Sequence, residues 1–381
     1  MPPHGEVNAI TRAVRRLRAA HTAFVDLSES NPTQVGLPYP PDLLAPLGDE
    51  RALHYEPHPL GLRSAREAVA GEFARRGATV DPDHLVLSAS TSEAYSWLFK
   101  LLCEPGEAVL VPHPSYPLFE YLSRLEGVRT VPYPLAYHGR WDVDIHALTA
   151  APETTRAVLA VSPNNPTGSF LSRRDLAALV DICRRRGWAL IVDEVFADYP
   201  VDVEAPLTDV AADADVLAFT LGGASKSIGL PQVKLGWTLV GGPAAVRDEA
   251  LSALEVIADT YLSVSTPAQL AAPALLQNGS VVRAAIRHRV DTNLTMARRL
   301  ASAHPACDLL PVEGGWSLIV RVPAARSEEQ MVLDLLDQER VLVHPGFFFD
   351  LPHEAFVVVS LLPVPDVFAD AFARTLRHLS S

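Results

Sequence analysis

Short apolar runs rich in β-branched residues recur along the first two thirds of the chain, and each predicts a strand. These runs are found at residues 84–88, 108–112, 156–162, 188–194, 215–221 and 236–240. Between most of them, apolar residues recur with helical spacing, which predicts amphipathic helices. The helical stretches are clearest at 63–76, 92–103, 115–126 and 172–187. This alternation predicts an α/β fold with a mainly parallel sheet flanked by helices on both faces.

The pattern changes beyond residue 243, where two long helical stretches, 243–258 and 265–303, replace the alternation. Strand-like segments and further helical stretches follow, and the strand sequences are WSLIVRV, VLVHP and AFVVVSL. This mixture predicts a second, smaller α+β domain. The expected parts are an N-terminal arm that belongs to the small domain (1–47), a large domain (48–278) and a small C-terminal domain (279–381).

Polar or aromatic side chains follow five of the predicted strands in succession. In chain order they are Ser90 with Thr91 and Ser92, then Tyr116, Asn165, Asp193 and Lys226. Each has an ordinary explanation by itself, as a helix cap, a turn residue or part of the core. Ligands of such sheets bind beyond the carboxyl ends of the strands, however. The succession therefore favours one shared site at this edge of the sheet.

The use of lysine sharpens this interpretation. Lysine and arginine together number 32, but only Lys100, Lys226 and Lys234 are lysines, and two of these lie in the segment TLGGASKSIGLPQVKLGW. A lysine amine can lose its proton and attack a carbonyl, whereas a guanidinium stays charged. A phosphate-binding P-loop would require glycines where Ser225 and Thr220 stand. The segment therefore favours a nucleophilic lysine.

Composition and charge exclude several classes of protein. The net charge of −13 and the pI of about 5.4 argue against nucleic acid or an anionic membrane as the main partner. The three cysteines lie far apart and fit neither a disulfide framework nor a zinc site, so we expect a cytoplasmic protein without a metal. No G-x-G-x-x-G motif follows an early strand, which disfavours a dinucleotide-dependent dehydrogenase.

The side chains at the strand ends match the chemical needs of pyridoxal 5'-phosphate (PLP). Its aldehyde requires a lysine amine, and its pyridine nitrogen requires a carboxylate that keeps the ring protonated and electron-withdrawing. Its phosphate requires hydroxyls and the N–H groups of a helix N-terminus, and its ring requires an aromatic neighbour. The predicted strand ends supply each of these groups.

The chain resembles the fold-type I PLP-dependent enzymes, and within them the class I/II aminotransferases of the aspartate aminotransferase superfamily. The motifs NNPTG, VDEVF and ASKSIGLPQVKLGW carry the resemblance, in this order, and it extends over nearly the whole chain. The resemblance implies that Lys226 forms the Schiff base and carries the proton, that Asp193 pairs with the ring nitrogen, and that Asn165 donates to the phenolic oxygen. It also implies that Tyr116 stacks on the ring.

The same resemblance implies further roles for residues outside these motifs. The phosphate ligands it implies are Ser90, Thr91, Ser92, Ser225 and Lys234. Tyr55 would reach the phosphate of the neighbouring subunit in a homodimer. Gly36, Asn31, Asn165 and Trp316 would line the substrate pocket.

The chain departs from the family pattern at three places. Lys234 and Phe196 stand where the family usually has an arginine for the phosphate and a tyrosine for the phenolic oxygen. Val358 stands where the family has the arginine that binds the substrate carboxylate, and 341–373 contains no arginine. Three alternatives follow. Arg321 could bind the substrate carboxylate instead, although strand alternation directs Arg321 away from the face of Trp316. Otherwise neutral donors at Gly36, Asn31 and Asn165 together bind the carboxylate, or the substrate has no carboxylate there.

We therefore predict a PLP-dependent aminotransferase that moves an amino group between an amino acid and a 2-oxo acid, as a homodimer. The alternative is another PLP-dependent reaction on an amino acid or amine, such as elimination, decarboxylation, condensation or cyclisation, which the absence of the arginine favours. A non-catalytic sensing module on the same fold is the third hypothesis. The presence of both Lys226 and Asp193 argues against it.

Overall fold

The structure is a computed structural model that describes residues 8–202, 215–352 and 355–380. Residues 1–7 of the predicted N-terminal arm lie outside the described residues. Within the described part of the chain, no helix is both long and apolar enough to cross a bilayer.

A sheet of eight strands in the order β2-β9-β8-β7-β6-β3-β4-β5 forms the centre of the larger part of the molecule. The strands are β2 (Leu85–Ser88), β3 (Ala108–His113), β4 (Arg129–Tyr137), β5 (Trp141–Val143), β6 (Thr155–Val161), β7 (Ala189–Asp193), β8 (Ala218–Gly223) and β9 (Gly236–Gly241). The strands from β8 to β4 are parallel, whereas β9 and the edge strand β5 run antiparallel to their neighbours. The predicted mainly parallel sheet is confirmed.

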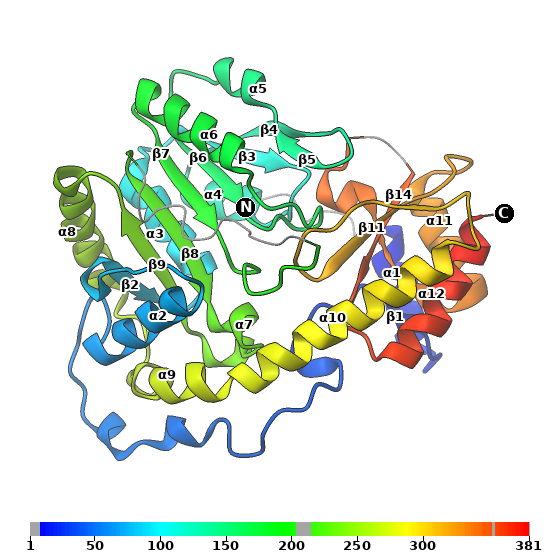
Figure 1. Cartoon of the computed structure of the whole chain (residues 1–381), viewed down its shortest axis with the longest axis horizontal. Coiled ribbons are helices and arrows are strands. Elements are labelled where there is room, and N and C mark those ends of the chain that lie inside the picture. The colour runs from blue at the N-terminus through cyan, green and yellow to red at the C-terminus, as the bar shows by residue number, and fades with distance from the viewer. Residues whose placement is uncertain (1–7, 203–214, 353–354, 381) are drawn as a thin grey trace.

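Helices cover both faces of this sheet (Figure 1). They are α2 (Arg63–Arg75), α3 (Thr91–Leu102), α4 (Phe119–Leu125), α5 (Ile145–Thr149), α6 (Arg173–Arg186), α8 (Ala244–Tyr261) and α9 (Thr266–Asn278). Alternate residues of β7 enter different apolar clusters: Leu190 packs in the cluster that contains residues of α6, and Ile191 in the cluster that contains residues of α3. Because both faces are covered, every residue of β7 is buried and its sequence does not alternate.

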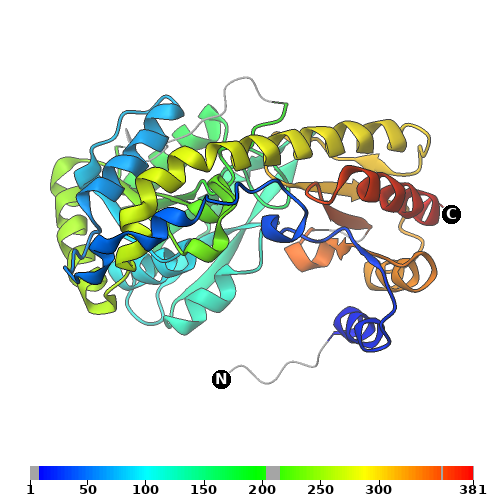
Figure 2. The same cartoon turned by 90° about the horizontal axis from the view of Figure 1, so that it is seen from below.

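The smaller part is built from both ends of the chain. Its antiparallel sheet has the order β10-β11-β14-β13, with β10 (Asp308–Leu309), β11 (Ser317–Arg321), β13 (His344–Pro345) and β14 (Phe356–Ser360). Beside it, β1 (Val25–Asp26) pairs with β12 (Val341–Leu342). The helices are α1 (Ala9–Ala19), α11 (Glu328–Asp334), which continues as the π-helix η6 (Leu335–Glu339), and α12 (Pro365–Leu379). Figure 2 shows α1 on the same side of the molecule as the C-terminal elements.

Short helical turns complete the fold. They are α7 (Ala224–Ser227) and the 3-10 turns η1 (Pro32–Gln34), η2 (Ala45–Gly48), η3 (Glu50–Leu53), η4 (Pro82–His84), η5 (Pro231–Val233) and η7 (Gly346–Phe349).

The long helix α10 (Ser280–Ala301) spans the two parts (Figures 1 and 2). The sequence predicts one helical stretch at 265–303, but the structure has two helices, because α9 ends before Gly279. A Cβ atom at Gly279 would lie 2.7 Å from the Cβ atom of Ile228, so only glycine fits where α10 begins. The domain boundaries at 47 and 278 stay a prediction.

Two strands of the large sheet escape the sequence pattern, as do the two-residue strands β1 and β10 of the smaller part. β4 contains Pro132 and Pro134 and exposes several of its side chains, and β5 is a short edge strand. Proline is unusual within a sheet, and neither segment shows a continuous apolar run. The helix expected at 115–126 is also shorter, because α4 begins only at Phe119.

Candidate active site

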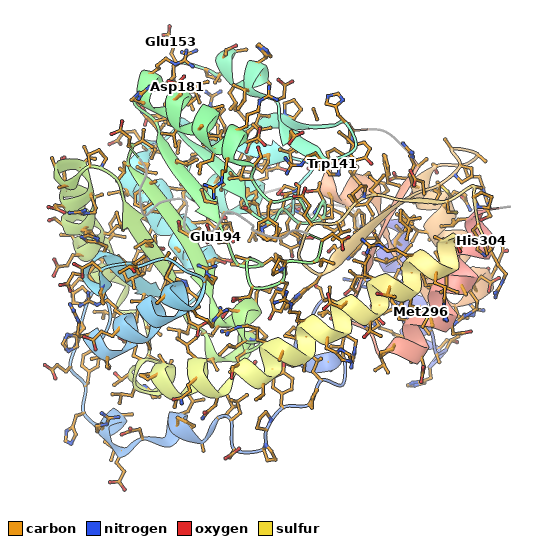
Figure 3. All side chains as sticks on the ribbon, in the orientation of Figure 1. Trp141, Glu153, Asp181, Glu194, Met296 and His304 are labelled. Atoms are coloured by element: carbon orange, nitrogen blue, oxygen red, sulfur yellow. The ribbon has the colours of Figure 1, made fainter. Side chains whose placement is uncertain are left out.

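The carboxyl end of β7 places Asp193 in the interior. Its Oδ2 atom accepts a hydrogen bond from the hydroxyl of Tyr95 at 2.7 Å, and its Oδ1 atom accepts one from the N–H of Val195 at 3.0 Å. Burial raises the pKa of Asp193, whereas these two donors and the charge of Lys226 act in the opposite direction. A carboxylate buried in this way gains from a cationic partner. Figure 3 labels the next residue, Glu194, near the middle of the molecule.

Lys226 lies in α7, the turn that follows β8. Its Nζ atom lies 4.9 Å from the ring centre of Trp316 and 5.4 Å from that of Phe196. Burial lowers the pKa of Lys226 to about 8, and the charge of Asp193 acts in the opposite direction. The amine is therefore neutral, and so nucleophilic, at a lower pH than an exposed lysine.

Hydrogen bonds to the backbone hold the turn that carries this lysine. The hydroxyl of Tyr199 donates to the carbonyl oxygen of Lys226 at 2.6 Å, and Nε of Arg283 donates to that of Ser227 at 2.9 Å. Arg283 is itself buried and paired with Glu72. Tyr199 and Arg283 thus hold the backbone of the turn and thereby position the amine. The sequence motifs include neither residue.

Three aromatic rings form a wall, and two of them, those of Phe196 and Trp316, lie beside the amine. Trp316 meets Phe196 and Tyr199 edge to face, with centroid separations of 5.2 and 5.1 Å. The indole N–H of Trp316 is buried and has no acceptor among the residues that the structure describes. Because the hydroxyl of Tyr199 is bonded to α7, this tyrosine does not replace the hydroxyl that Phe196 lacks.

The N-terminus of α3 follows β2, at the place predicted for the phosphate. Ser90 caps the helix, because its Oγ atom accepts a hydrogen bond from the N–H of Glu93 at 3.2 Å. Thr91 and Ser92 occupy the first turn, where backbone N–H groups have no partner within the helix. A Cβ atom at Gly236 of β9 would lie 3.0 Å from the carbonyl carbon of Ser90, so the backbone packs closely against this loop.

Two adjacent asparagines after β6 have different surroundings. Asn164 is buried, and its Nδ2 atom donates to the carbonyl oxygen of Pro114 at 3.0 Å and to Oγ1 of Thr167 at 2.9 Å. Asn165 instead accepts a hydrogen bond at Oδ1 from the hydroxyl of Ser317 on β11, at 3.1 Å. This hydrogen bond orients the amide of Asn165, whose Nδ2 group is the donor that a ligand can accept from.

Tyr116 is half exposed in the loop after β3. The preceding residue anchors this loop: the N–H of Ser115 donates to the carbonyl oxygen of Phe349 at 3.0 Å, and its hydroxyl donates to Asn164 at 3.2 Å. The loop is therefore tied both to η7 of the smaller part and to the loop after β6.

Val358 lies in the interior of β14, between Ile319 of β11 and His344 of β13. In the sheet register it shares a face with Ser317, the residue that bonds Asn165. That face therefore carries a valine at the position where the resemblance predicts an arginine.

Arg321 does not replace it. This arginine is exposed at the end of β11 and pairs with Asp308 of β10. Its charge is thus neutralised at the surface. In the register, Arg321 lies on the face of Ser317 and Val358, opposite that of Trp316, so its place at the exposed end of β11, and not strand alternation, keeps it from that role.

The remaining predicted residues lie in α7, at the end of η5 and in the N-terminal segment. Ser225 precedes Lys226 in α7, and Lys234 is exposed at the end of η5, with a left-handed φ of 57°. In the arm, Asn31 caps η1 and Gly36 follows it with a φ of 65°. Tyr55 is 69% exposed.

The structure thus brings part of the predicted site together. The joined residues are Asp193, Lys226, Phe196, Trp316 and, through Ser317, Asn165. Within the described part of the chain, no hydrogen bond, ion pair or ring contact links Tyr55, Tyr116 or Lys234 to this group. A ligand or a second subunit would be needed to connect them.

The sequence matches the model of a known protein family. The model of the family "Aminotransferase class I and II" matches residues 23–363. The chain belongs to this family.

Relatives and solved structures agree with this family. The glutamate-pyruvate aminotransferase AlaA of Haemophilus influenzae is 26% identical over 96% of this chain and 93% of its own, and the alanine aminotransferase of Mycobacterium bovis is 27% identical over 96% and 88%. The crystal structure of an aminotransferase from Escherichia coli superimposes with a TM-score of 0.86 at 25% identity, over 98% of this chain and 95% of that one. The protein is therefore a fold-type I aminotransferase that transfers amino groups with PLP.

The residues of this aminotransferase fit PLP. A partly buried amine with a lowered pKa suits an aldehyde, and a buried carboxylate with no cationic hydrogen-bond donor among the described residues suits a pyridinium. The capped N-terminus of α3 suits a phosphate.

Sequence reasoning missed three residues of the site: Tyr95, Tyr199 and Ser317. A tyrosine on the apolar face of a predicted helix was a usable signal for Tyr95, because a buried hydroxyl usually has a partner. No comparable signal marks Ser317, which begins a strand whose next three residues are apolar.

The lowered pKa of Lys226 predicts how PLP capture depends on pH. Only the neutral amine attacks an aldehyde, so the rate of PLP uptake by the apoprotein should rise with pH and reach half its maximum near pH 8, not near 10.5. Stopped-flow absorbance measures this rate. In Asp193→Asn the midpoint should move lower, because the opposing charge is gone; a midpoint near pH 10 in the unaltered protein would contradict the assignment.

Proposed function

We propose that Lys226 binds PLP covalently through its amine and then moves the proton at the substrate carbon. Bound PLP supplies an electron sink for the negative charge that develops there. Asp193 holds the positive charge of the ring nitrogen, and the Nδ2 group of Asn165 donates to the phenolic oxygen. The N-terminus of α3, with Ser90, Thr91, Ser92, Ser225 and Lys234, binds the phosphate. Tyr116 covers the ring.

One observation carries this proposal: the partly buried amine of Lys226 lies against Phe196 and Trp316 and near the charge of a buried Asp193. Burial of a lysine destabilises the folded protein, because it disfavours the charged form, so a lysine in this place suggests a function. The aromatic wall also excludes water from the reacting amine. These features support an amine that alternates between binding an aldehyde and carrying a proton.

We further propose that neutral donors bind the substrate carboxylate. Val358 offers no charge, and Arg321 is neutralised by Asp308. The proposed donors are the indole N–H of Trp316, which has no acceptor among the described residues, and the amide of Asn165, supplemented by backbone N–H groups near Gly36 and the side chain of Asn31. Because neutral hydrogen bonds are weaker than an arginine–carboxylate pair, recognition of α-amino acids should be broad.

A substrate panel tests this arrangement. The names of the relatives make alanine and glutamate the first donors to test, with pyruvate as an acceptor. We expect alanine to exceed its amide in kcat/KM by less than about a hundredfold, because no buried charge is left unpaired when the carboxylate is absent. A preference above about 10⁴-fold would indicate a dedicated carboxylate clamp and would refute the proposal.

We propose that the active unit is a homodimer in which Tyr55 reaches the phosphate of the neighbouring subunit. Tyr55 and Leu53 are 69% and 85% exposed, Leu53 at the end of η3 and Tyr55 just after it, which is unusual for large apolar side chains so close together. Within one chain, Tyr55 has no hydrogen bond or ring contact to the described site residues. A composite site at a two-fold interface would use both features.

Subunit mixing tests the composite site. Lys226→Ala and Tyr55→Phe homodimers should each be impaired, and heterodimers formed from them should regain activity, because one of their two sites is intact. The control is a mixture of Lys226→Ala with Lys226→Ala, which should stay inactive. A fully active monomer at high dilution, measured by sedimentation, would rule out the arrangement.

We place the enzyme in the cytoplasm. Its cysteines, Cys103, Cys183 and Cys307, are all free, which supports a reducing compartment.

A further inference from the structure

Asp193 has a partner that none of the motifs contains, the hydroxyl of Tyr95. The two residues lie 98 positions apart in the sequence, and their side chains are both buried where the hydroxyl donates to Oδ2 at 2.7 Å. The second donor to the carboxylate is the N–H of Val195, at 3.0 Å. Two donors fix the plane of the carboxylate and leave acceptor sites for one further partner.

The position of Tyr95 is rigid. It lies early in α3, the helix whose N-terminus is the proposed phosphate site, and its ring meets Phe119 of α4 edge to face at 5.2 Å. The ring of Phe99, one turn further along α3, lies 6.1 Å from that of Tyr95, centroid to centroid. A single helix therefore carries both the phosphate-binding end and the hydroxyl at Asp193, so it sets the distance between the two.

We propose that Tyr95 is a positioning residue that keeps the proton of the Asp193–ring pair on the ring nitrogen. A phenol that donates to a carboxylate stabilises the negative charge and lowers the affinity of the carboxylate for a proton. The proton shared with the pyridine nitrogen then stays on nitrogen, where it makes the ring electron-withdrawing. The inference rests on the role proposed for Asp193 at this nitrogen.

Burial explains why such a donor is required. By itself, burial raises the pKa of Asp193, which would favour a protonated carboxyl and a neutral ring. The charged and titratable groups that act against this are Tyr95 from α3 and Lys226 from α7. Once the amine of Lys226 is bound to the cofactor, it no longer carries the charge of a free ammonium. Tyr95 and the N–H of Val195 then remain to stabilise the carboxylate.

The test compares three variants by the state of the ring nitrogen itself. Each is loaded with PLP that carries a nitrogen label in the ring, and nitrogen NMR follows the signal as a function of pH, because protonated and neutral pyridine nitrogens resonate far apart. In Tyr95→Phe we expect the nitrogen to lose its proton at a lower pH than in the unaltered enzyme. We also expect kcat to fall roughly ten- to a hundredfold with KM changed less than about threefold, as for a lost bond to a charged group.

Tyr133→Phe is the matched control. Tyr133 is also buried at the sheet, but its hydroxyl donates to the carbonyl oxygen of Leu159, at 2.8 Å. This variant should leave the nitrogen signal unmoved, even if it lowers stability.

Asp193→Asn separates the proposed role of Tyr95 from the proposed role of Asp193 at the ring nitrogen. If it moves the nitrogen signal and Tyr95→Phe does not, the role of Tyr95 is refuted and that of Asp193 stands. If neither variant moves the signal, Asp193 is not the partner of the ring, and both proposals fail. If Tyr95→Phe does not fold, Tyr95→Trp takes its place. The pKa of Asp193 is then measured by carbon NMR in the apoprotein of this variant and of the unaltered enzyme, and loss of the hydroxyl should raise that pKa.

Discussion

Replacing Lys226 with alanine is expected to lower turnover by more than about 10⁴-fold, because the amine that both binds PLP and moves the proton is lost. The variant should still bind PLP through the phosphate and ring contacts, but without a covalent bond. Borohydride reduction of the unaltered enzyme, followed by proteolysis and mass spectrometry, should find the pyridoxyl group on Lys226.

Because the chain contains only three lysines, the labelled residue can be identified with little ambiguity. Lys100 is the matched control, because it pairs with Glu126 outside the site and its replacement by alanine should leave turnover within about twofold. A pyridoxyl group on Lys234, or on neither lysine of the segment, would overturn the assignment of the nucleophile.

Asp193→Asn is expected to lower kcat by about 10² to 10⁴-fold while the protein keeps part of its PLP. The amide has nearly the shape of the carboxylate, but it cannot stabilise a positive charge on the ring nitrogen in a buried site. Steady-state kinetics together with the absorbance of bound PLP would separate loss of turnover from loss of cofactor.

Asp175→Asn provides a control for changing a buried carboxylate. Asp175 is also buried, at the start of α6, where its side chain bonds Ser172 and burial raises its pKa. Its replacement should change stability more than turnover. Near-normal turnover in Asp193→Asn would show that the carboxylate does not face the ring.

The positions of the main chemical groups could be predicted because they are local properties of the sequence. Asp193 ends an apolar strand, and Lys226 and Asn165 each follow one. Parallel strands end at one edge, so the order of these residues along the chain largely determines where they lie. The mainly parallel sheet follows from the same alternation. For this reason the fold class was correct although several boundaries were not.

The contacts around these groups could not be predicted, because they depend on how distant elements cross. Tyr95 reads as a core residue of an amphipathic helix, and only the packing of α3 on β7 makes its hydroxyl a partner of Asp193. Ser317 contacts Asn165 only because β11 lies against the loop after β6. In β4, Pro132 and Pro134 suppress the signal of a strand that the sheet nevertheless accommodates.

The pairing of β1 with β12 has a consequence for the order in which the protein forms during synthesis. All the strands of the large sheet lie between Leu85 and Gly241, so that sheet can assemble while the rest of the chain is still being translated. The smaller part has to wait, because Val25 finds its partner only when Val341 has left the ribosome. Until then the apolar face of α1, with Ile10, Ala13 and Leu17, stays uncovered in the nascent chain. Chaperone demand should therefore be greatest near the end of translation, after Lys226 has already been placed.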